Sequence, residues 1–183
     1  MKLFSFFDKK DKKQVYRCAC CGNIYDEIPL CFGSDFPDYY LSIPLEEREC
    51  RVELMESLCI VDEKHFFHRG RLVIPIIDYS ENLIFNVWTS ISEDNFRERM
   101  DLWNNPDRIN QEPYFGWMQT NVPTYDNTLN IKTIAIEQGL GLIPKIESIE
   151  EGHQITIDQE NGITYKRAIE IVDEITRHQH NSN

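Results

Sequence analysis

Residues 58–91, LCIVDEKHFFHRGRLVIPIIDYSENLIFNVWTSI, decide the fold class of this chain. β-branched and aromatic residues, which favour strands, are concentrated in three segments of it: 58–61, 65–77 and 83–91. The connections between these segments are too short to contain a crossover helix, so consecutive strands must pair antiparallel. The stretch therefore predicts an antiparallel meander.

A helix follows the meander. Ser92 is a preferred N-cap residue, and Phe96, Met100 and Trp103 recur at the spacing of one helix face, which we expect to pack against the sheet. Pro106 ends this segment, and an aromatic loop comes next at 113–117. Two or three more strands are expected, at 131–136, 142–149 and 153–157.

Two further helices complete the expected fold. One begins near Pro44, and the last begins at Thr164 with a buried face made of Ala168, Ile169, Val172 and Ile175. The pattern predicts an α+β fold with a mainly antiparallel sheet, two or three packed helices and an N-terminal turn resembling a zinc knuckle.

Length and composition indicate one folded domain. The chain has 183 residues, of which 41% are hydrophobic and 27% are charged, as in ordinary globular proteins. We expect a disordered, basic, aromatic tail at 1–13, a single domain at 14–177 and a disordered end at 178–183. No apolar run reaches the roughly 18 residues that span a bilayer, and no secretory signal is recognisable, so a cytoplasmic location is expected.

Charge is unevenly distributed along the chain. The net charge is −12, but residues 1–13 contain five lysines and two aspartates, which leaves −15 for the remainder. An acidic body repels phosphates, so nucleic acid is excluded as the expected partner and a basic protein is favoured. The phenylalanines and lysines of the tail could also contact an anionic membrane surface.

Residues 18–22, Cys-Ala-Cys-Cys-Gly, predict a metal-binding turn. Cys18 and Cys21 have the C-x-x-C spacing with which two thiolates chelate one zinc ion, and Gly22 permits the tight turn that this requires. In a reducing compartment, cysteines are more often free thiols or ligands than disulfides. A structural zinc ion takes four ligands, so the others must come from Cys20, Cys31, Cys50, Cys59, His65, His68 or His153.

Hairpin geometry narrows that set. If the turn after Val61 has two residues, Cys59 shares a sheet face with His68; if it has three, Cys59 shares a face with His65. We therefore predict a zinc site formed by Cys18, Cys21, Cys59 and His65, with Cys31 or His68 as substitutes.

Many short segments carry a resemblance to a known family. Besides Cys18, Cys21 and Gly22, the matching segments are 28–30, 32–33, 37–42, 46–48, 58–62, 65–67, 69–70, 74–76, 88–92, 113–117 and 130–133. Together they resemble the bacterial domain of unknown function family 2199 over residues 16–175. The resemblance implies a bacterial protein of a family to which no activity is assigned.

Common catalytic motifs are absent from the sequence, including H-E-x-x-H, G-x-S-x-G, the P-loop and G-x-G-x-x-G. We therefore predict a non-enzymatic protein-binding module, of which an immunity-type inhibitor of a bacterial toxin is one concrete form. The aromatic residues expected to anchor its partner are Tyr39, Tyr40, Tyr114, Phe115 and Trp117. The alternative is a hydrolase or other enzyme that uses His65, His68 or Asp78 as acid or base.

Overall fold

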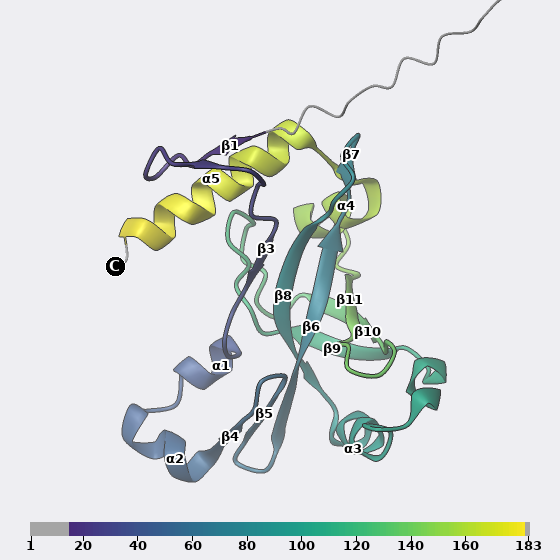
Figure 1. Ribbon diagram of the computed structural model, residues 1–183. Helices are drawn as coiled ribbons and strands as arrows, with labels where there is room; N and C mark the ends of the chain where they lie inside the picture. Colours follow the sequence, from purple (N-terminus) through teal and green to yellow (C-terminus); the bar gives the residue numbers. More distant parts are fainter. Residues whose placement is uncertain (1–14, 182–183) are drawn as a thin grey trace, which may run out of the picture.

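The structure is a computed structural model that describes residues 15–181 (Figure 1). Its fold is α+β with mostly antiparallel strands, as the sequence predicts, but the strands close into a small barrel rather than remaining an open meander. The predicted tail at 1–13 lies outside the described residues.

Five strands form the barrel: β6 (His65–Ile74), β8 (Leu83–Ile91), β9 (Tyr114–Met118), β10 (Lys132–Ile136) and β11 (Lys145–Ser148). β6 pairs antiparallel with β8 along its length, and β8, β9, β10 and β11 follow in antiparallel order. β11 then returns to β6 in a short parallel pairing, which closes the barrel. Closure leaves these strands without a free edge over the paired segments.

Three strands extend the sheet beyond the barrel. β5 (Leu58–Val61) and β4 (Val52–Leu54) continue from β6, and β3 (Cys31–Gly33) pairs in parallel with β8. Val61 pairs with His65, so the connecting turn has three residues, the second of the two registers considered above.

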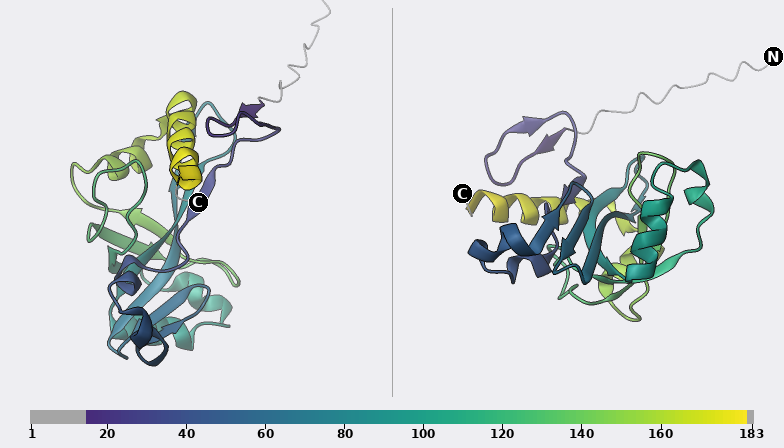
Figure 2. Two further views of the ribbon diagram at one scale, coloured as in Figure 1. Left: turned by 90° about the vertical axis from the view of Figure 1, so that its left-hand side faces the viewer. Right: turned by 90° about the horizontal axis from the view of Figure 1, so that it is seen from below.

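Two small two-stranded sheets lie outside this arrangement. β1 (Tyr16–Arg17) pairs with β2 (Ile24–Tyr25), and β12 (Ile163–Thr164) pairs with β7 (Ile76–Ile77). The β1–β2 hairpin stands out from the rest of the molecule (Figure 2).

The described residues contain five α-helices, so the predicted number of two or three is not confirmed. α1 (Asp38–Leu41) and α2 (Arg48–Arg51) are single turns, whereas α3 (Glu93–Asp101), α4 (Gln154–Asn161) and α5 (Tyr165–Asn181) are longer. Two 3-10 helices, η1 (Leu45–Glu47) and η2 (Pro106–Asn110), precede α2 and follow α3. α5 includes residues 178–181, which the sequence predicted to be disordered.

Two segments were assigned the wrong element. Residues 153–157 were expected to be a strand, but His153 caps α4: its Nδ1 accepts a hydrogen bond from the Ile155 amide at 3.2 Å. Residues 113–117 were expected to be a loop, but most of them form β9. Its alternating buried and exposed residues have the period of a strand, and Gly116 fits it because a side chain there would meet the Ser90 carbonyl oxygen at 2.5 Å.

The expected apolar face of α3 is also different in the structure. Ser92 caps the helix as predicted, with its hydroxyl accepting from the Asn95 amide at 3.2 Å. Phe96 is buried, but Met100 and Trp103 are 41% and 36% exposed, and Arg99 is buried in their place. The face of α3 that packs inward therefore includes the charged residue Arg99, which the spacing of the apolar residues does not predict.

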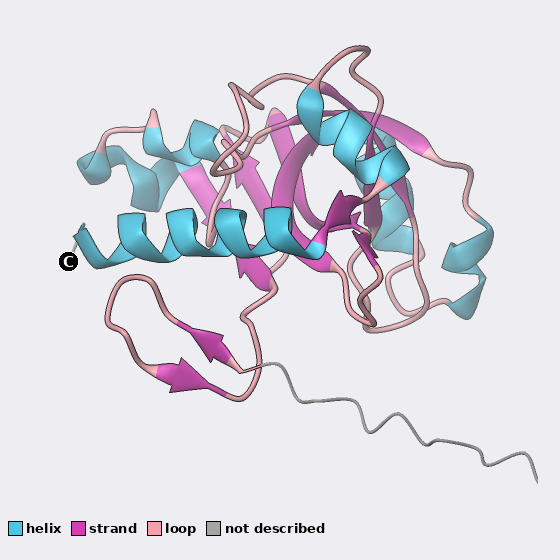
Figure 3. Ribbon diagram, turned by 90° about the horizontal axis from the view of Figure 1, so that it is seen from above, coloured by secondary structure: helices cyan, strands magenta, loops and turns pink. Residues whose placement is uncertain are grey.

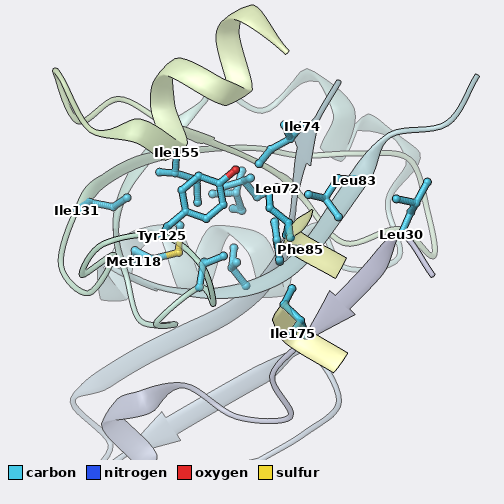
Figure 4. Packing of buried hydrophobic residues seen from close by; sticks show 14 of the residues in the cluster. Leu30, Leu72, Ile74, Leu83, Phe85, Met118, Tyr125, Ile131, Ile155 and Ile175 are labelled. Atoms are coloured by element: carbon cyan, nitrogen blue, oxygen red, sulfur yellow. The ribbon is translucent and has the colours of Figure 1, made fainter. Parts of the chain in front are cut away.

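Buried side chains form two clusters on opposite faces of the sheet. The larger fills the barrel and continues beneath α4 and α5, where Leu72, Ile74, Phe85 and Ile155 converge (Figure 4). α5 contributes the predicted face, of which Ile169 is only partly buried. The smaller cluster lies on the other face of β5 and β6, beside α1. It comprises Ile43, Cys59, Val61, Phe67 and Trp88.

No helix among residues 15–181 is both long enough and apolar enough to cross a membrane.

Candidate functional site

A tight turn brings the N-terminal cysteines together between β1 and β2. The Gly22 amide donates to the Cys18 carbonyl at 2.9 Å, and the Cys18 amide donates to the Asn23 carbonyl at 2.9 Å. Gly22 has a φ of 72°, a left-handed conformation that glycine adopts without a steric penalty. The sequence therefore folds residues 18–23 into a compact loop, which we call the cysteine corner.

Three thiols gather in the cysteine corner. The Sγ atoms of Cys18, Cys20 and Cys21 all lie within 4.8 Å of one another, and those of Cys18 and Cys20 are 2.9 Å apart. Two thiolates bound to one tetrahedral zinc ion lie about 3.8 Å apart, given a Zn–S bond of about 2.3 Å. The corner can therefore hold a metal ion after small movements of the thiols.

Hydrogen bonds around Cys18 favour its thiolate form. The Cys20 thiol and the backbone amides of Cys21 and Cys20 lower the pKa of Cys18 to about 7. The same thiol–thiol contact, together with burial, raises the pKa of Cys20 to about 11. One thiolate is thus available near neutral pH, and thiolates are the form that binds metal.

The cysteine corner is attached to α5. Tyr16 is 4% exposed, and its hydroxyl donates to Asp173 Oδ1 on α5 at 2.8 Å. Burial and this hydrogen bond raise the pKa of the Tyr16 hydroxyl, which therefore stays protonated. Figure 3 shows the hairpin lying beside α5. The corner is consequently fixed at one side while the Cys21 side chain remains exposed.

The other predicted ligands do not reach the cysteine corner. Cys59 is fully buried in the smaller cluster, where burial raises the pKa of its thiol to about 11. His65 lies at the start of β6 with its ring 5.0 Å from that of Tyr39. Figure 1 places β5 and the start of β6 at the opposite end of the molecule from β1. Cys59 and His65 share a sheet face, but they lie too far from Cys18 and Cys21 for all four residues to bind one ion.

The substitute ligands lie elsewhere as well. Cys31 is on β3, where its Sγ accepts from Asn86 Nδ2 at 3.5 Å, and His68 is enclosed in the barrel. The ligand that the sequence undervalued is Cys20, whose position inside the C-x-x-C segment was itself the signal. A turn as tight as this one directs neighbouring thiols toward a common point.

The predicted partner-binding aromatics divide into three groups. Phe115 and Trp117 point outward from β9, are 40% and 43% exposed, and contact each other edge to face at 4.9 Å. Tyr39 and Tyr40 are half-buried on α1. Tyr114 is 5% exposed inside the barrel, so it cannot touch a partner of the folded protein. The alternation of buried and exposed residues along β9 explains why Tyr114 points inward while Phe115 and Trp117 point outward.

The residues proposed for an enzyme are not brought together. His65 begins β6, and Asp78 follows β7 beyond the far end of the same strand. Ten residues of β6 span about 30 Å, so the two side chains cannot share one substrate. His68 is enclosed between them.

A buried charged layer closes one end of the barrel, and it was not predicted from the sequence. Glu137 follows β10 and is 2% exposed. Its carboxylate accepts hydrogen bonds from the guanidinium groups of Arg99 and Arg108, and from the Tyr114 hydroxyl at 2.6 Å. Both arginines are almost completely buried. These residues come from α3, η2, β9 and the end of β10, so no local motif connects them.

His68 lies beside this charged layer. Its ring centroid is 5.7 Å from that of Tyr114, it is fully buried, and neither ring nitrogen has a hydrogen-bond partner in the described part of the chain. Burial, and to a smaller extent the charge of Arg99, hold the pKa of His68 well below its usual range. The imidazole is therefore neutral in the folded protein at neutral pH.

One family matches the chain. The family is described as "Uncharacterized protein conserved in bacteria (DUF2199)", and it matches residues 17–163. No curated protein and no solved structure matches. The match covers the cysteine corner, the whole barrel and the buried charged layer.

Proposed function

The chain belongs to the bacterial family DUF2199, which carries no assigned activity, and from its geometry we propose a protein-binding domain with a zinc ion at the cysteine corner. The observation that carries the zinc proposal is the convergence of three thiols within 4.8 Å of one another. Zinc is the natural occupant because it prefers thiolates and needs no redox change.

The proposed role of the zinc ion is structural. β1 and β2 have two residues each and stand apart from the barrel, so few backbone hydrogen bonds hold the hairpin closed. A metal that joins Cys18, Cys20 and Cys21 would add three strong bonds to this turn. The group formed by the described residues has three members, so the fourth ligand of a structural site would come from outside this group.

Metal analysis tests the zinc site. We expect purified protein to contain about one equivalent of zinc, and Cys21→Ser to lose most of it without unfolding, because Cys21 is exposed. Cobalt replacement should give a thiolate-to-metal charge-transfer band that disappears in the same variant.

The matched control is Cys50→Ser. Cys50 is also exposed, but it lies on α2, where its thiol donates to the Glu47 carbonyl. It should leave the zinc content unchanged. Protein without metal after purification in the presence of zinc, or equal zinc in Cys21→Ser, would refute the proposal.

Protein binding is the second part of the proposed function. Phe67, Ser90 and Trp117 are paired in one row across β6, β8 and β9, and paired side chains point to the same face. Tyr39 lies over Phe67 at 5.4 Å, so Tyr39 and Trp117 border the same surface. We call the surface formed by Tyr39, Phe115 and Trp117 the aromatic face. Exposed aromatic residues are typical anchors of protein interfaces.

A basic protein is the proposed occupant of the aromatic face. The chain outside residues 1–13 carries a net charge of −15, which would attract a basic partner and speed its approach. An inhibitor of a basic toxin of the immunity type is one form of this interaction.

Co-purification from the source bacterium tests this proposal. We expect a basic protein to be recovered with the wild-type chain and lost with the double variant Phe115→Ser, Trp117→Ser. Ile157→Ser is the control, because Ile157 is similarly exposed at 39% but lies on α4. Recovery of no specific partner, or of the same partner with all three proteins, would refute the proposal.

A further inference from the structure

A cavity of about 670 Å³ lies between the outer face of the barrel and the segment that carries α3 and η2. The outer face of β6 and β8 forms one wall, and residues 138–145 form another. Arg99 and Arg108 line it from the side of the buried charged layer. A volume of this size suits a small molecule.

The lining of this cavity is strongly basic. Five cationic side chains line it, Arg69, Arg71, Arg99, Arg108 and Lys145, against the single carboxylate of Glu56. The sequence contains 19 Lys and Arg in all, and the chain carries a net charge of −12. Concentrating so many cations in one place opposes the overall charge. Glu137, buried behind Arg99 and Arg108, and Glu147, which pairs with Lys145 at 2.7 Å, neutralise part of this charge.

Two of these arginines have a buried donor without a hydrogen-bond partner among residues 15–181. Arg99 is 2% exposed, and its Nε has no hydrogen-bond partner. The same is true of the buried Nε of Arg69. Neither Arg69 nor Arg71 has an ion pair with any residue in 15–181. Buried donors without partners are costly, so a site that leaves them unpaired is prepared for an acceptor from outside.

Strand pairing holds the cationic wall in place. Arg71 pairs with Lys145 of β11 on one side and with Asn86 of β8 on the other. The three side chains therefore form a row across the outer face of the closed barrel, where the backbone is rigid. Within this row Lys145 pairs with Glu147, and the Asn86 amide donates to Cys31 Sγ. The Arg71 guanidinium is therefore the group placed to bind a ligand.

Part of the cavity lining is apolar. Trp103 lies 5.5 Å from the Arg99 guanidinium and 5.8 Å from that of Arg108, measured to the ring centroid. Leu140 and Leu142 also line the cavity and are 51% and 55% exposed. A flat or apolar group could rest on this part of the lining while an anionic group faces the arginines.

We propose that this cavity binds a small organic anion in which a phosphate or carboxylate group is joined to a flat apolar portion. Arginine suits both anions, because its planar guanidinium donates two parallel hydrogen bonds to either. The site is separate from the cysteine corner and from the aromatic face. It therefore adds a ligand to the proposed function and does not depend on it.

Calorimetric titration of the full chain with four probes tests the proposal. Phenyl phosphate and benzoate each combine a ring with an anion, phosphate supplies the anion alone, and phenol supplies the ring alone. We expect phenyl phosphate or benzoate to bind at least about tenfold more tightly than phenol and inorganic phosphate. The tighter of the two identifies the anionic group. Binding no tighter than that of phenol would overturn the proposal.

Variants locate the binding. Arg71→Gln, at an exposed position, should weaken binding of the better probe by about tenfold or more, with unchanged zinc content. Lys166→Gln, which removes a cation exposed on α5, is the control and should bind like the wild type. Equal weakening in both variants, or in neither, would place the anion elsewhere and overturn the proposal.

Discussion

The cysteine corner and the buried charged layer are opposite kinds of site in one small protein. The corner is formed by residues close together in the sequence, stands outside the barrel and brings three thiols within 4.8 Å of one another. The charged layer is formed by residues from four separate elements, and Glu137 accepts a hydrogen bond from each of Arg99 and Arg108 within the protein. The comparison shows that a short stretch of sequence can specify a candidate metal site, whereas the buried charged layer forms only when distant elements come together in the closed barrel.

The largest expected effect comes from removing the acid of the charged layer. Glu137→Gln leaves the guanidinium groups of Arg99 and Arg108 buried without a counter-charge. Breaking a buried ion pair in this way costs about 3–5 kcal/mol. Urea denaturation should therefore show a free energy of unfolding lower by about that amount.

Glu93→Gln is the control for this variant. Its carboxylate pairs with Arg97 on the exposed surface of α3, and exposed pairs contribute little. It should leave the free energy of unfolding essentially unchanged. Similar losses in both variants would show that the buried layer has no special role.

A smaller effect is expected when only one donor of the layer is removed. Tyr114→Phe deletes the hydroxyl that donates to Glu137 at 2.6 Å but keeps both arginines and the aromatic ring. A hydrogen bond to a charged group contributes about 1.5–3 kcal/mol, so the free energy of unfolding should fall within that range. A fall as large as that of Glu137→Gln would contradict the order of importance within the layer.

His68 gives the layer a pH dependence. The folded pKa of His68 is lowered, so below about pH 6.5 the unfolded chain takes up a proton that the folded protein does not. Folding stability should be complete above that pH and should fall by up to about 1.4 kcal/mol per pH unit as the pH decreases.

Comparison with His68→Leu isolates this contribution, since carboxylates titrate in the same region. The free energy of unfolding, measured between pH 7 and 5.5, should depend less on pH in the variant. Equal slopes in the two proteins would mean that His68 does not stay neutral in the folded state.

The features that could be predicted from the sequence are those determined by residues close together along the chain. The cap at Ser92, the bounds of β8 and the tight turn at Gly22 follow from local patterns. The pairing of Val61 with His65 is one of the two registers that local patterns left open. Barrel closure could not be predicted in this way, because the parallel pairing of β11 with β6 joins residues more than seventy positions apart.

The failures in the candidate sites have the same origin. Cys59 and His65 share a sheet face as the three-residue turn requires, but no local pattern shows that β5 and the start of β6 lie far from β1. Arg99 interrupts an apolar helix face, and its burial is explained by its ion pair with Glu137, which lies 38 positions later in the sequence. The ion pairs of the buried charged layer therefore could not be predicted without the three-dimensional structure.

Hydrogen exchange of the full chain, measured with bound zinc and after chelation, tests the contrast between the two sites most directly. The account predicts that residues 16–25 lose protection when zinc is removed, because the hairpin depends on the ion, while β9 and β10 around the charged layer keep theirs. Unchanged protection at 16–25, or a loss that extends to β9 and β10, would contradict it.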